Sequence, residues 1–386
     1  MSVLYQFIKQ YYIPILIALI SKIIVLFIIA ELSTNLIVNS RASNLNIWQL
    51  WNVWDAPHYI SVAEFGYQKL GDEANFIILL PLFPLSIFLL KFLFNVNYLV
   101  SGYLSSFMFS ILLSIVLYKL VLIDYPKRVA NMTILMLFIF PTSFFLHIPY
   151  TEPLFISLTV SSFYFVRRQR YWLSFICAGL ASATKIAGLA LIPALFLEII
   201  IFNKGSLKKN IFNYLNVSLR NNKHILLFGL LISLSGFLVY LTINYYLWGN
   251  FFYFTIIQNQ HWYERFSPFG QGLIDAFKAI SWRSGIDRLM LGYGQIIAFI
   301  LGLFMSIYVL VKVRISYGLF MIINLFFYYS MSFWICMMRY ILTLFPMYLV
   351  LAIFSNNKIF LYIWILLSSV LLIILSLIFI QNGHVL

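Results

Sequence analysis

Long apolar stretches, each able to cross a lipid bilayer, fill most of this chain and constrain its fold more than any other feature. A membrane-spanning helix needs roughly 20 consecutive apolar residues, and 63% of the residues are hydrophobic while only 9% are charged. The sequence therefore predicts an all-α, polytopic integral membrane protein with about 11 transmembrane helices. These are expected at 12–30, 99–121, 129–147, 153–166, 171–184, 186–202, 224–247, 290–311, 315–334, 340–354 and 358–380.

The charge and cysteine content exclude several other classes. The net charge of +14 comes from basic residues scattered between apolar runs, not from a basic domain with nucleic-acid-reading motifs, so nucleic acid is not an expected partner. Cys177 and Cys336 both lie in apolar segments and predict neither a disulfide framework nor a metal cluster. The first apolar run lacks a small-residue cleavage site, so we expect it to stay as an anchor.

An apolar run at 76–94 is broken by Pro81 and Pro84, and the basic residues favour a re-entrant or in-plane segment there. If this run does not cross, 15 of the 25 basic residues fall in inside loops and nine of the eleven acids fall outside, as the positive-inside rule requires. The N-terminus is then inside and the C-terminus outside. The basic residues are Lys9, Lys119, Lys127, Arg128, Arg167, Arg168, Arg170, Lys204, Lys208, Lys209, Arg220, Lys223, Lys312, Arg314 and Lys358; the acids are Glu31, Asp55, Glu64, Asp72, Glu73, Glu152, Glu264, Asp275 and Asp287.

This topology predicts one transmembrane domain over residues 1–386 with its polar regions gathered at the outer face. The first outer region is 31–98, which includes the re-entrant segment. A short turn at 146–152 and a large outer loop at 248–289 complete the set.

The first outer region contains the sequence Trp54-Asp55-Ala56-Pro57-His58-Tyr59, where a carboxylate, an imidazole and aromatic rings meet beside the membrane. Asp55 has two interpretations. It suits the N-cap of a helix, because Pro57 favours a first helical turn and Gly66 a helix end. It also suits a general base, which needs an ionisable group within hydrogen-bond reach of a hydroxyl. His58 lies one turn later and would share its face.

The aromatic residues of this region, Trp54, Tyr59 and Tyr67, are typical of interfacial anchors. They would equally suit a sugar face or an isoprenoid chain. Structural packing is also the simpler interpretation of His58.

Isolated charges next to the predicted spans form a second group of candidates. Glu152 follows Tyr150 at the start of a predicted helix, where the helix dipole alone favours an acid. Lys185 lies between two apolar spans with no nearby partner, and an ionisable residue there is a functional hypothesis by default. Arg339, beside Tyr340, is equally isolated, and His261 and Arg265 add positive charge to the large outer loop. Together they suggest a site for an anion, such as a lipid phosphate, beside a base. The role of Lys22, in the middle of the first span, is not predicted.

The chain resembles the PIG-V-type (GPI mannosyltransferase-like) branch of the GT-C glycosyltransferases, which use polyprenyl-phosphate sugars. The motifs that carry the resemblance occur in family order over residues 50–350. They are Trp54-Asp55 with His58-Tyr59 and Gly66-Tyr67, Pro81-Leu82-Phe83-Pro84, Pro141-Thr142-Ser143-Phe144-Phe145, Tyr150-Thr151-Glu152 with Phe155, Ala178-Gly179-Leu180 with Lys185 and Gly188, and Arg339-Tyr340 with Phe345-Pro346.

The resemblance implies an inverting transfer of a sugar, typically mannose, from a polyprenyl phosphate to a hydroxyl acceptor at the outer or lumenal face. It gives Asp55 the role of base and implies substrate contacts from the other candidate residues. Lys185 departs from the family, which usually has Arg there; a lysine still supplies positive charge but lacks the bidentate fork. The first outer region has no Asp-x-Asp, so no metal cofactor is implied.

The expected partners are the lipid-linked donor, an unidentified glycan, lipid or protein acceptor, and membrane lipids. The expected location is the plasma membrane of a prokaryote, or the endoplasmic reticulum in a eukaryote. Two alternatives stay open, a flippase or other transporter of lipid-linked sugars and a non-catalytic subunit of a transferase. Transporters commonly contain internal repeats with paired broken helices, which this sequence does not display.

Overall fold

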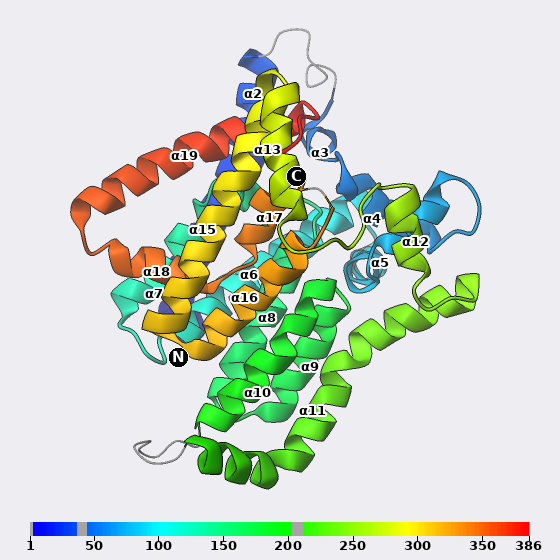
Figure 1. Ribbon diagram of the computed structural model, residues 1–386. Helices are drawn as coiled ribbons and strands as arrows, with labels where there is room; N and C mark the ends of the chain where they lie inside the picture. Colours follow the sequence, from blue (N-terminus) through cyan, green and yellow to red (C-terminus); the bar gives the residue numbers. More distant parts are fainter. Residues whose placement is uncertain (1–2, 37–44, 203–210, 333, 386) are drawn as a thin grey trace.

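The computed structural model describes residues 3–36, 45–202, 211–332 and 334–385 as a helical bundle (Figure 1). Lys204, Lys208 and Lys209 of the predicted inside loop lie outside these ranges. The described elements, in chain order, are α1 (Val3–Ile23), η1 (Ile24–Ile29), α2 (Ala30–Leu36), α3 (Ile47–Leu50), α4 (Asp55–Phe65), η3 (Asp72–Ile78), α5 (Leu82–Phe94), α6 (Tyr98–Val121), α7 (Lys127–Phe138), η4 (Ser143–Leu146), α8 (Glu152–Arg167), α9 (Tyr171–Ser182), η5 (Ile186–Ala190), α10 (Leu191–Phe202), α11 (Ile211–Trp248), α12 (Tyr253–Gln260), α13 (Gln271–Trp282), α14 (Gly285–Asp287), η6 (Arg288–Gly294), α15 (Gln295–Tyr308), η7 (Val309–Val313), α16 (Ile315–Tyr329), α17 (Met337–Leu342), α18 (Pro346–Phe354) and α19 (Lys358–Ile380).

The predicted all-α membrane fold is confirmed. Within the described residues the only β pairing is one isolated bridge between Phe266 and Met331. Helical stretches long and apolar enough to span a membrane run over Lys9–Asn35, Tyr98–Val121, Asn222–Trp248, Gly285–Val313 and Lys358–Ile380.

The predicted count of about 11 spans is not confirmed, because several apolar helices are short. Helices α7, α9 and α10 have 12 residues each and are therefore about 18 Å long, against a hydrocarbon core of about 30 Å. The proline-containing run at 76–94 forms two pieces, η3 and α5, bent by 112°. A straight crossing by this run is therefore excluded.

Local sequence explains where the long helices begin. Asn97 accepts a hydrogen bond from the Val100 amide at the start of α6, and Asn357 accepts from the amides of Ile359 and Phe360 at the start of α19. Side-chain caps of this kind stabilise the first turn, whose amides lack helical partners. The predicted boundaries of these two helices are accordingly accurate to one residue.

Helices α6 and α8 pack together, α8 packs on α9, and α9 packs on α11. Figure 1 shows α9, α10 and α11 as neighbouring green helices at one side of the bundle. Gly236 of α11 touches α9, because a Cβ atom at this position would lie 2.0 Å from the Gly179 carbonyl oxygen. This contact lets the two helix backbones approach without intervening side chains.

The segment between α7 and α8 corrects the predicted helix at 129–147. Helix α7 ends at Phe138, and the chain then follows a buried, irregular path through η4 to Glu152. Buried carbonyls in such a path need donors from elsewhere. Ser106 donates to the Ile148 carbonyl at 2.6 Å, Ser110 donates to the Leu146 carbonyl, and Lys22 Nζ donates to the His147 carbonyl at 3.2 Å. This contact explains a lysine in the first span.

At the opposite end of α8, Arg167 belongs to a partly buried ion cluster, in which Arg167 and Glu198 are buried and Asp124 is exposed. Arg167 donates to both carboxylate oxygens of Asp124 at 2.7 Å, and Arg314 donates to both oxygens of Glu198, at 2.6 Å for the shorter contact. Arg167 Nε lies 3.4 Å from Glu198 Oε1 and joins the two pairs. Asp124 and Glu198 are the two acids that the predicted topology places on the inner side. We therefore call Asp124, Arg167, Glu198 and Arg314 the inner cluster.

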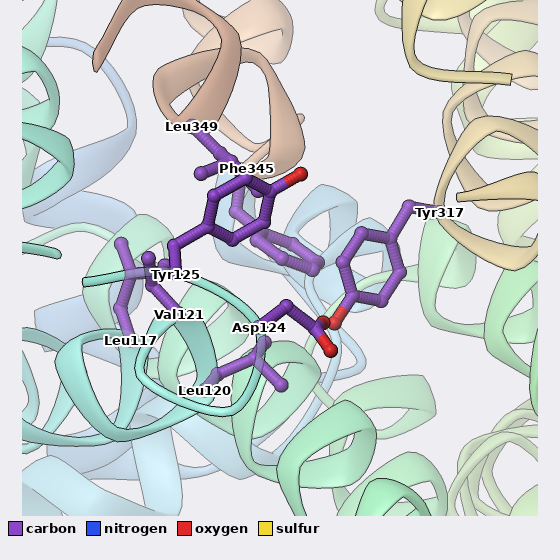
Figure 2. Close-up of a pocket in the computed structure, with 8 residues that line it drawn as sticks. All are labelled: Leu117, Leu120, Val121, Asp124, Tyr125, Tyr317, Phe345 and Leu349. Carbon is purple, nitrogen blue, oxygen red and sulfur yellow. The ribbon is translucent and has the colours of Figure 1, made fainter. Parts of the chain in front are cut away.

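A small cavity adjoins this cluster. Figure 2 shows the Asp124 carboxylate and the Tyr317 hydroxyl beside each other, with Tyr125 and Phe345 also lining the cavity. Its volume of about 10 Å³ is near the minimum for one water molecule. This cavity is therefore too small for a substrate, and the ion pairs of the cluster connect α8, α10 and the start of α16.

Candidate active site

Asp55 is the first residue of α4, and the N-cap interpretation is wrong. Trp54 occupies the N-cap position, and its side chain makes no capping hydrogen bond. The Asp55 backbone amide donates to the Tyr150 hydroxyl at 3.2 Å, and this hydroxyl donates to the Val53 carbonyl at 3.0 Å. Tyr150 therefore fixes the backbone on both sides of Trp54 and leaves the Asp55 carboxylate free for another partner. The predicted helix end at Gly66 is confirmed.

Trp54 has a strained backbone with φ of +58°. A bulky residue in this region costs on the order of 1–3 kcal/mol and persists only where surrounding contacts hold it. Its ring lies 5.2 Å from the ring of His384, and Val53 is held by Tyr150. This strained residue directly precedes Asp55 and sets the direction in which α4 begins.

The Asp55 carboxylate joins a chain of four charged side chains. Asp55 Oδ2 is 2.6 Å from Arg339 Nη1, Arg339 Nε is 3.5 Å from Glu152 Oε1, and the same Glu152 oxygen is 2.6 Å from Lys185 Nζ. We call these residues the four-residue network. It contains two carboxylates and two cationic side chains, so its charges balance. Glu152, which contacts both cations, is fully buried.

Aromatic rings surround the two cations of this network. The Arg339 guanidinium lies 5.4 Å from the centre of the Tyr150 ring, 5.6 Å from Phe145 and 5.5 Å from Tyr340. Lys185 Nζ lies 5.4 Å from the same Tyr340 ring. Ring faces attract cations at these distances. Tyr59 packs edge-on against Tyr150, at 6.3 Å between ring centres.

Breaks between short helices deliver these side chains to one place. Lys185 lies in the break between α9 and η5, where the Leu82 amide donates to the Ala183 carbonyl at 3.1 Å. This bond brings the proline-rich start of α5 next to Lys185. Arg339 lies in α17, whose Met338 carbonyl accepts from Thr142 Oγ1 at 3.1 Å. The motifs at 81–84 and 141–145 therefore help to position Lys185 and Arg339, because each donates a hydrogen bond to a backbone carbonyl near one of these residues.

His58 faces the large outer loop. Its ring stacks on Phe76 at 4.4 Å and meets Trp262 at 5.7 Å. Burial lowers the pKa of His58, an effect that Asp55 opposes and His261 reinforces. His58 is therefore mainly neutral near pH 7 and suited to hydrogen bonding more than to holding an anion.

Three of the predicted site residues make contacts elsewhere in the described structure. The Tyr67 hydroxyl donates to the Leu79 carbonyl, which stabilises the approach to α5. Arg265 is exposed, and its backbone pairs with Ser332. His261 is also exposed, and its ring lies 5.0 Å from that of Trp262.

Sequence reasoning missed two groups near the network. Glu264 of the outer loop accepts a hydrogen bond from Gln258, and burial raises its pKa to about 7, with Arg339 opposing the rise and Asp55 adding to it. Cys336 Sγ lies 3.8 Å from Arg339 Nη2. The sequence identifies Glu264 only as an acid in an outer loop and Cys336 only as part of an apolar run.

No group of three or more histidine, cysteine, aspartate or glutamate side chains suited to a metal ion is found in the described ranges. The four-residue network offers two carboxylates, each already bonded to a cation.

Membrane-spanning helices with a buried, charge-balanced network at one end of α8 define the class: this is a multi-pass membrane protein. Among curated proteins, the chain is similar to the GPI alpha-1,6-mannosyltransferase 2 of Mus musculus, with 34% identity over 146 residues, and to that of Cricetulus griseus, with 31% over 147 residues. Each match covers 35% of this chain and 29% of the relative. These matches confirm the resemblance to the PIG-V-type branch over about a third of the chain.

Solved structures give a weaker comparison. The oligosaccharyltransferase of Archaeoglobus fulgidus, crystallised with a tethered acceptor peptide, has a TM-score of 0.42 and 13% identity, with 98% of this chain and 56% of that chain covered. AglB of the same organism, in complex with an inhibitory peptide and a dolichol-phosphate, has a TM-score of 0.43 and 12% identity, with 97% and 56% covered. No family model matches the chain.

Proposed function

We propose that this protein is an inverting membrane glycosyltransferase that moves a sugar, mannose by preference, from a polyprenyl-phosphate donor to a hydroxyl acceptor. The observation that carries the proposal is the contact between Asp55 and Arg339 at 2.6 Å. It joins a carboxylate suited to proton abstraction to a cation suited to a phosphate. The similarity to GPI alpha-1,6-mannosyltransferase 2 supports the reaction class.

The reaction follows from the roles of three side chains. The acceptor oxygen attacks the anomeric carbon and gives its proton to the Asp55 carboxylate. The bond between this carbon and the phosphate oxygen breaks, and the lipid phosphate leaves with the bonding electrons. Lys185 and Arg339 stabilise its charge, which is most effective in a site that excludes water. Attack opposite the leaving phosphate inverts the anomeric carbon.

The Asp55 carboxylate is suited to this role by its surroundings. Only its Oδ2 oxygen contacts Arg339, and within the described part of the chain the other oxygen accepts no hydrogen bond. Its side chain is 24% exposed, unlike the fully buried Glu152. Asp55 is therefore the carboxylate of the network that an acceptor can reach.

The position of the site within the bundle supports a lipid-borne donor. Lys22, in the middle of a membrane-spanning stretch, contacts the His147 carbonyl, and the same irregular segment leads to Tyr150 and Glu152. These contacts support a position of the network below the membrane surface, where the phosphate of a polyprenyl lipid can enter from the bilayer. The active site is proposed to open to the outer or lumenal face, with the N-terminus on the cytoplasmic side.

Asp55→Asn tests the role of the base. Asparagine keeps the size of the side chain and can still accept a hydrogen bond from Arg339, but it cannot take a proton from the acceptor. Loss of a general base lowers the rate by about a hundredfold to ten-thousandfold. The assay follows release of polyprenyl phosphate from polyprenyl-phosphate mannose in vesicles containing a membrane lipid extract as acceptor.

The matched controls are Glu64→Gln, Asp72→Asn and Glu73→Gln, which alter exposed acids of the same outer region. They should retain wild-type turnover. Wild-type turnover by Asp55→Asn, combined with an inactive control variant, would move the base to another residue. Normal transfer by all four variants would exclude a carboxylate mechanism in this region.

A further inference from the structure

Glu152 Oε2 is a buried carboxylate oxygen that has no hydrogen-bond partner among the described residues. Glu152 Oε1 contacts Lys185 at 2.6 Å and Arg339 at 3.5 Å, whereas Oε2 accepts no hydrogen bond from any described residue. Buried polar atoms are nearly always hydrogen-bonded, and leaving a charged one without a donor is strongly unfavourable. Oε2 can therefore accept a hydrogen bond from a group outside the described residues.

The location of Oε2 indicates where that donor comes from. Its sister oxygen Oε1 contacts both cations, Lys185 and Arg339, that hold the donor phosphate in the proposed function. The phosphate is bonded to the anomeric carbon of the sugar. The nearest sugar hydroxyl to such a phosphate is the one on the adjacent ring carbon, C2.

We propose, building on the proposed function, that Glu152 Oε2 accepts a hydrogen bond from the C2 hydroxyl of the donor sugar. Glu152 is then a specificity-determining residue that selects lipid phosphates of neutral sugars with a free C2 hydroxyl. Sugars with an acetamido group or hydrogen at C2 are rejected. A hydrogen bond to an ionised carboxylate is roughly twice as strong as a neutral one, and a contact to this hydroxyl strengthens as charge develops at the anomeric carbon.

A purely structural role for Glu152 gives a different expectation. If the carboxylate serves only to balance the charges of Lys185 and Arg339, removing the C2 hydroxyl from the donor removes no contact with Glu152 and leaves kcat/KM unchanged. The two roles are therefore separated by changing the substrate in the wild-type protein, which avoids any effect of a substitution on folding.

The experiment measures kcat/KM with four donors: polyprenyl-phosphate mannose and its 2-deoxy, 4-deoxy and 6-deoxy forms. A site built to bind a hydroxyl discriminates strongly against an analogue that lacks it. We expect the 2-deoxy donor to lose roughly a hundredfold or more, and the 6-deoxy donor to lose only a few-fold. Equal use of the 2-deoxy and parent donors would overturn the inference.

A variant adds an independent measurement. In Glu152→Gln the loss caused by the 2-deoxy donor should largely disappear, because a residue and a substrate group that contact each other give non-additive effects. Glu64→Gln, an exposed acid in α4, should keep the full loss. If the 2-deoxy donor lowers kcat/KM in Glu152→Gln by the same factor as in the wild type, the inference is also overturned. Absence of transfer with every donor would instead refute the proposed function on which the inference rests.

Discussion

Asp55 and Arg339 are 284 positions apart in the chain, yet their side chains form a 2.6 Å ion pair. Arg339 and Lys185 are only 7% and 13% exposed. Removing one member of a buried pair leaves the other charge uncompensated, which destabilises a protein by about 3–5 kcal/mol. Substitutions in the four-residue network therefore affect stability and catalysis together, and each test needs a measurement of both.

Lys185, at the end of the network, is tested by a pair of substitutions with both measurements. Lys185→Met keeps most of the side-chain volume but removes the positive charge that stabilises the leaving phosphate. We expect the transfer rate to fall by roughly a hundredfold. Lys185→Arg should retain most activity, since the PIG-V-type pattern has arginine at this position. Steady-state transfer rates and thermal unfolding in detergent provide the two readouts.

The control for this pair is Lys127→Met, at an exposed lysine in the first turn of α7. It should change neither rate nor stability. Wild-type rates for Lys185→Met in folded protein would leave Lys185 as an ion-pair partner of Glu152 alone.

The sequence could identify all four members of the network but not their pairing. Lys185 and Arg339 are recognisable as isolated charges beside apolar runs, and Asp55 as the acid of an aromatic motif. Their partners cannot be predicted because nothing local specifies contacts over such chain separations. Glu198 was missed for the same reason: its partner Arg314 lies 116 positions away.

At the level of elements, hydropathy predicts the long helices well and the short broken ones poorly. Helix α19 begins and ends as expected at 358–380, because one apolar run coincides with one helix and Asn357 caps it. Helix α7 ends earlier than its apolar run, because the following carbonyls find donors on other helices, including Ser106 and Ser110. Such long-range donors are not visible in a local window.

The large outer loop contributes Glu264, a partly buried residue whose raised pKa predicts a pH dependence of stability. Its pKa is raised from 4.5 to about 7, so between these values the folded state holds a proton that the unfolded state has released. The contribution of Glu264 to stability is then greatest below pH 4.5 and is lost as pH rises to about 7. Gln258 and Arg339 act against this shift, and Asp55 adds to it.

Glu264→Gln should remove this dependence. Glutamine carries no charge to bury, so the variant should unfold at a higher temperature than wild type at pH 8, with the difference shrinking towards pH 5. Thermal unfolding of detergent-solubilised protein at several pH values measures it. A difference that is constant with pH would mean that Glu264 titrates normally in the folded protein.

At the scale of the whole molecule, α8 separates two ion clusters with different roles. Glu152 is its first residue and Arg167 its last, so the clusters lie about 22 Å apart along the helix. The network at Glu152 has an oxygen that no described residue contacts by a hydrogen bond, and it has a partly exposed acid, Asp55. The cluster at Arg167 adjoins a cavity with room for one water molecule at most.

This division predicts that the inner cluster stabilises the bundle without affecting chemistry. Arg314→Leu leaves Glu198 without its bidentate partner and should destabilise the protein by about 3–5 kcal/mol. The transfer rate per folded molecule should remain that of wild type. A lower unfolding temperature at unchanged specific activity is the expected result, while a specific loss of turnover in stable protein would assign the inner cluster a functional role.

The most direct test of the central claim uses purified protein in vesicles with polyprenyl-phosphate mannose that carries a radiolabel on the sugar, and with membrane lipid extract as acceptor. A glycosyltransferase moves the label to an acceptor and leaves unlabelled polyprenyl phosphate, and Asp55→Asn slows both changes by about a hundredfold or more. Movement of intact labelled lipid across the bilayer, with no label reaching any acceptor, would contradict the account and identify a transporter.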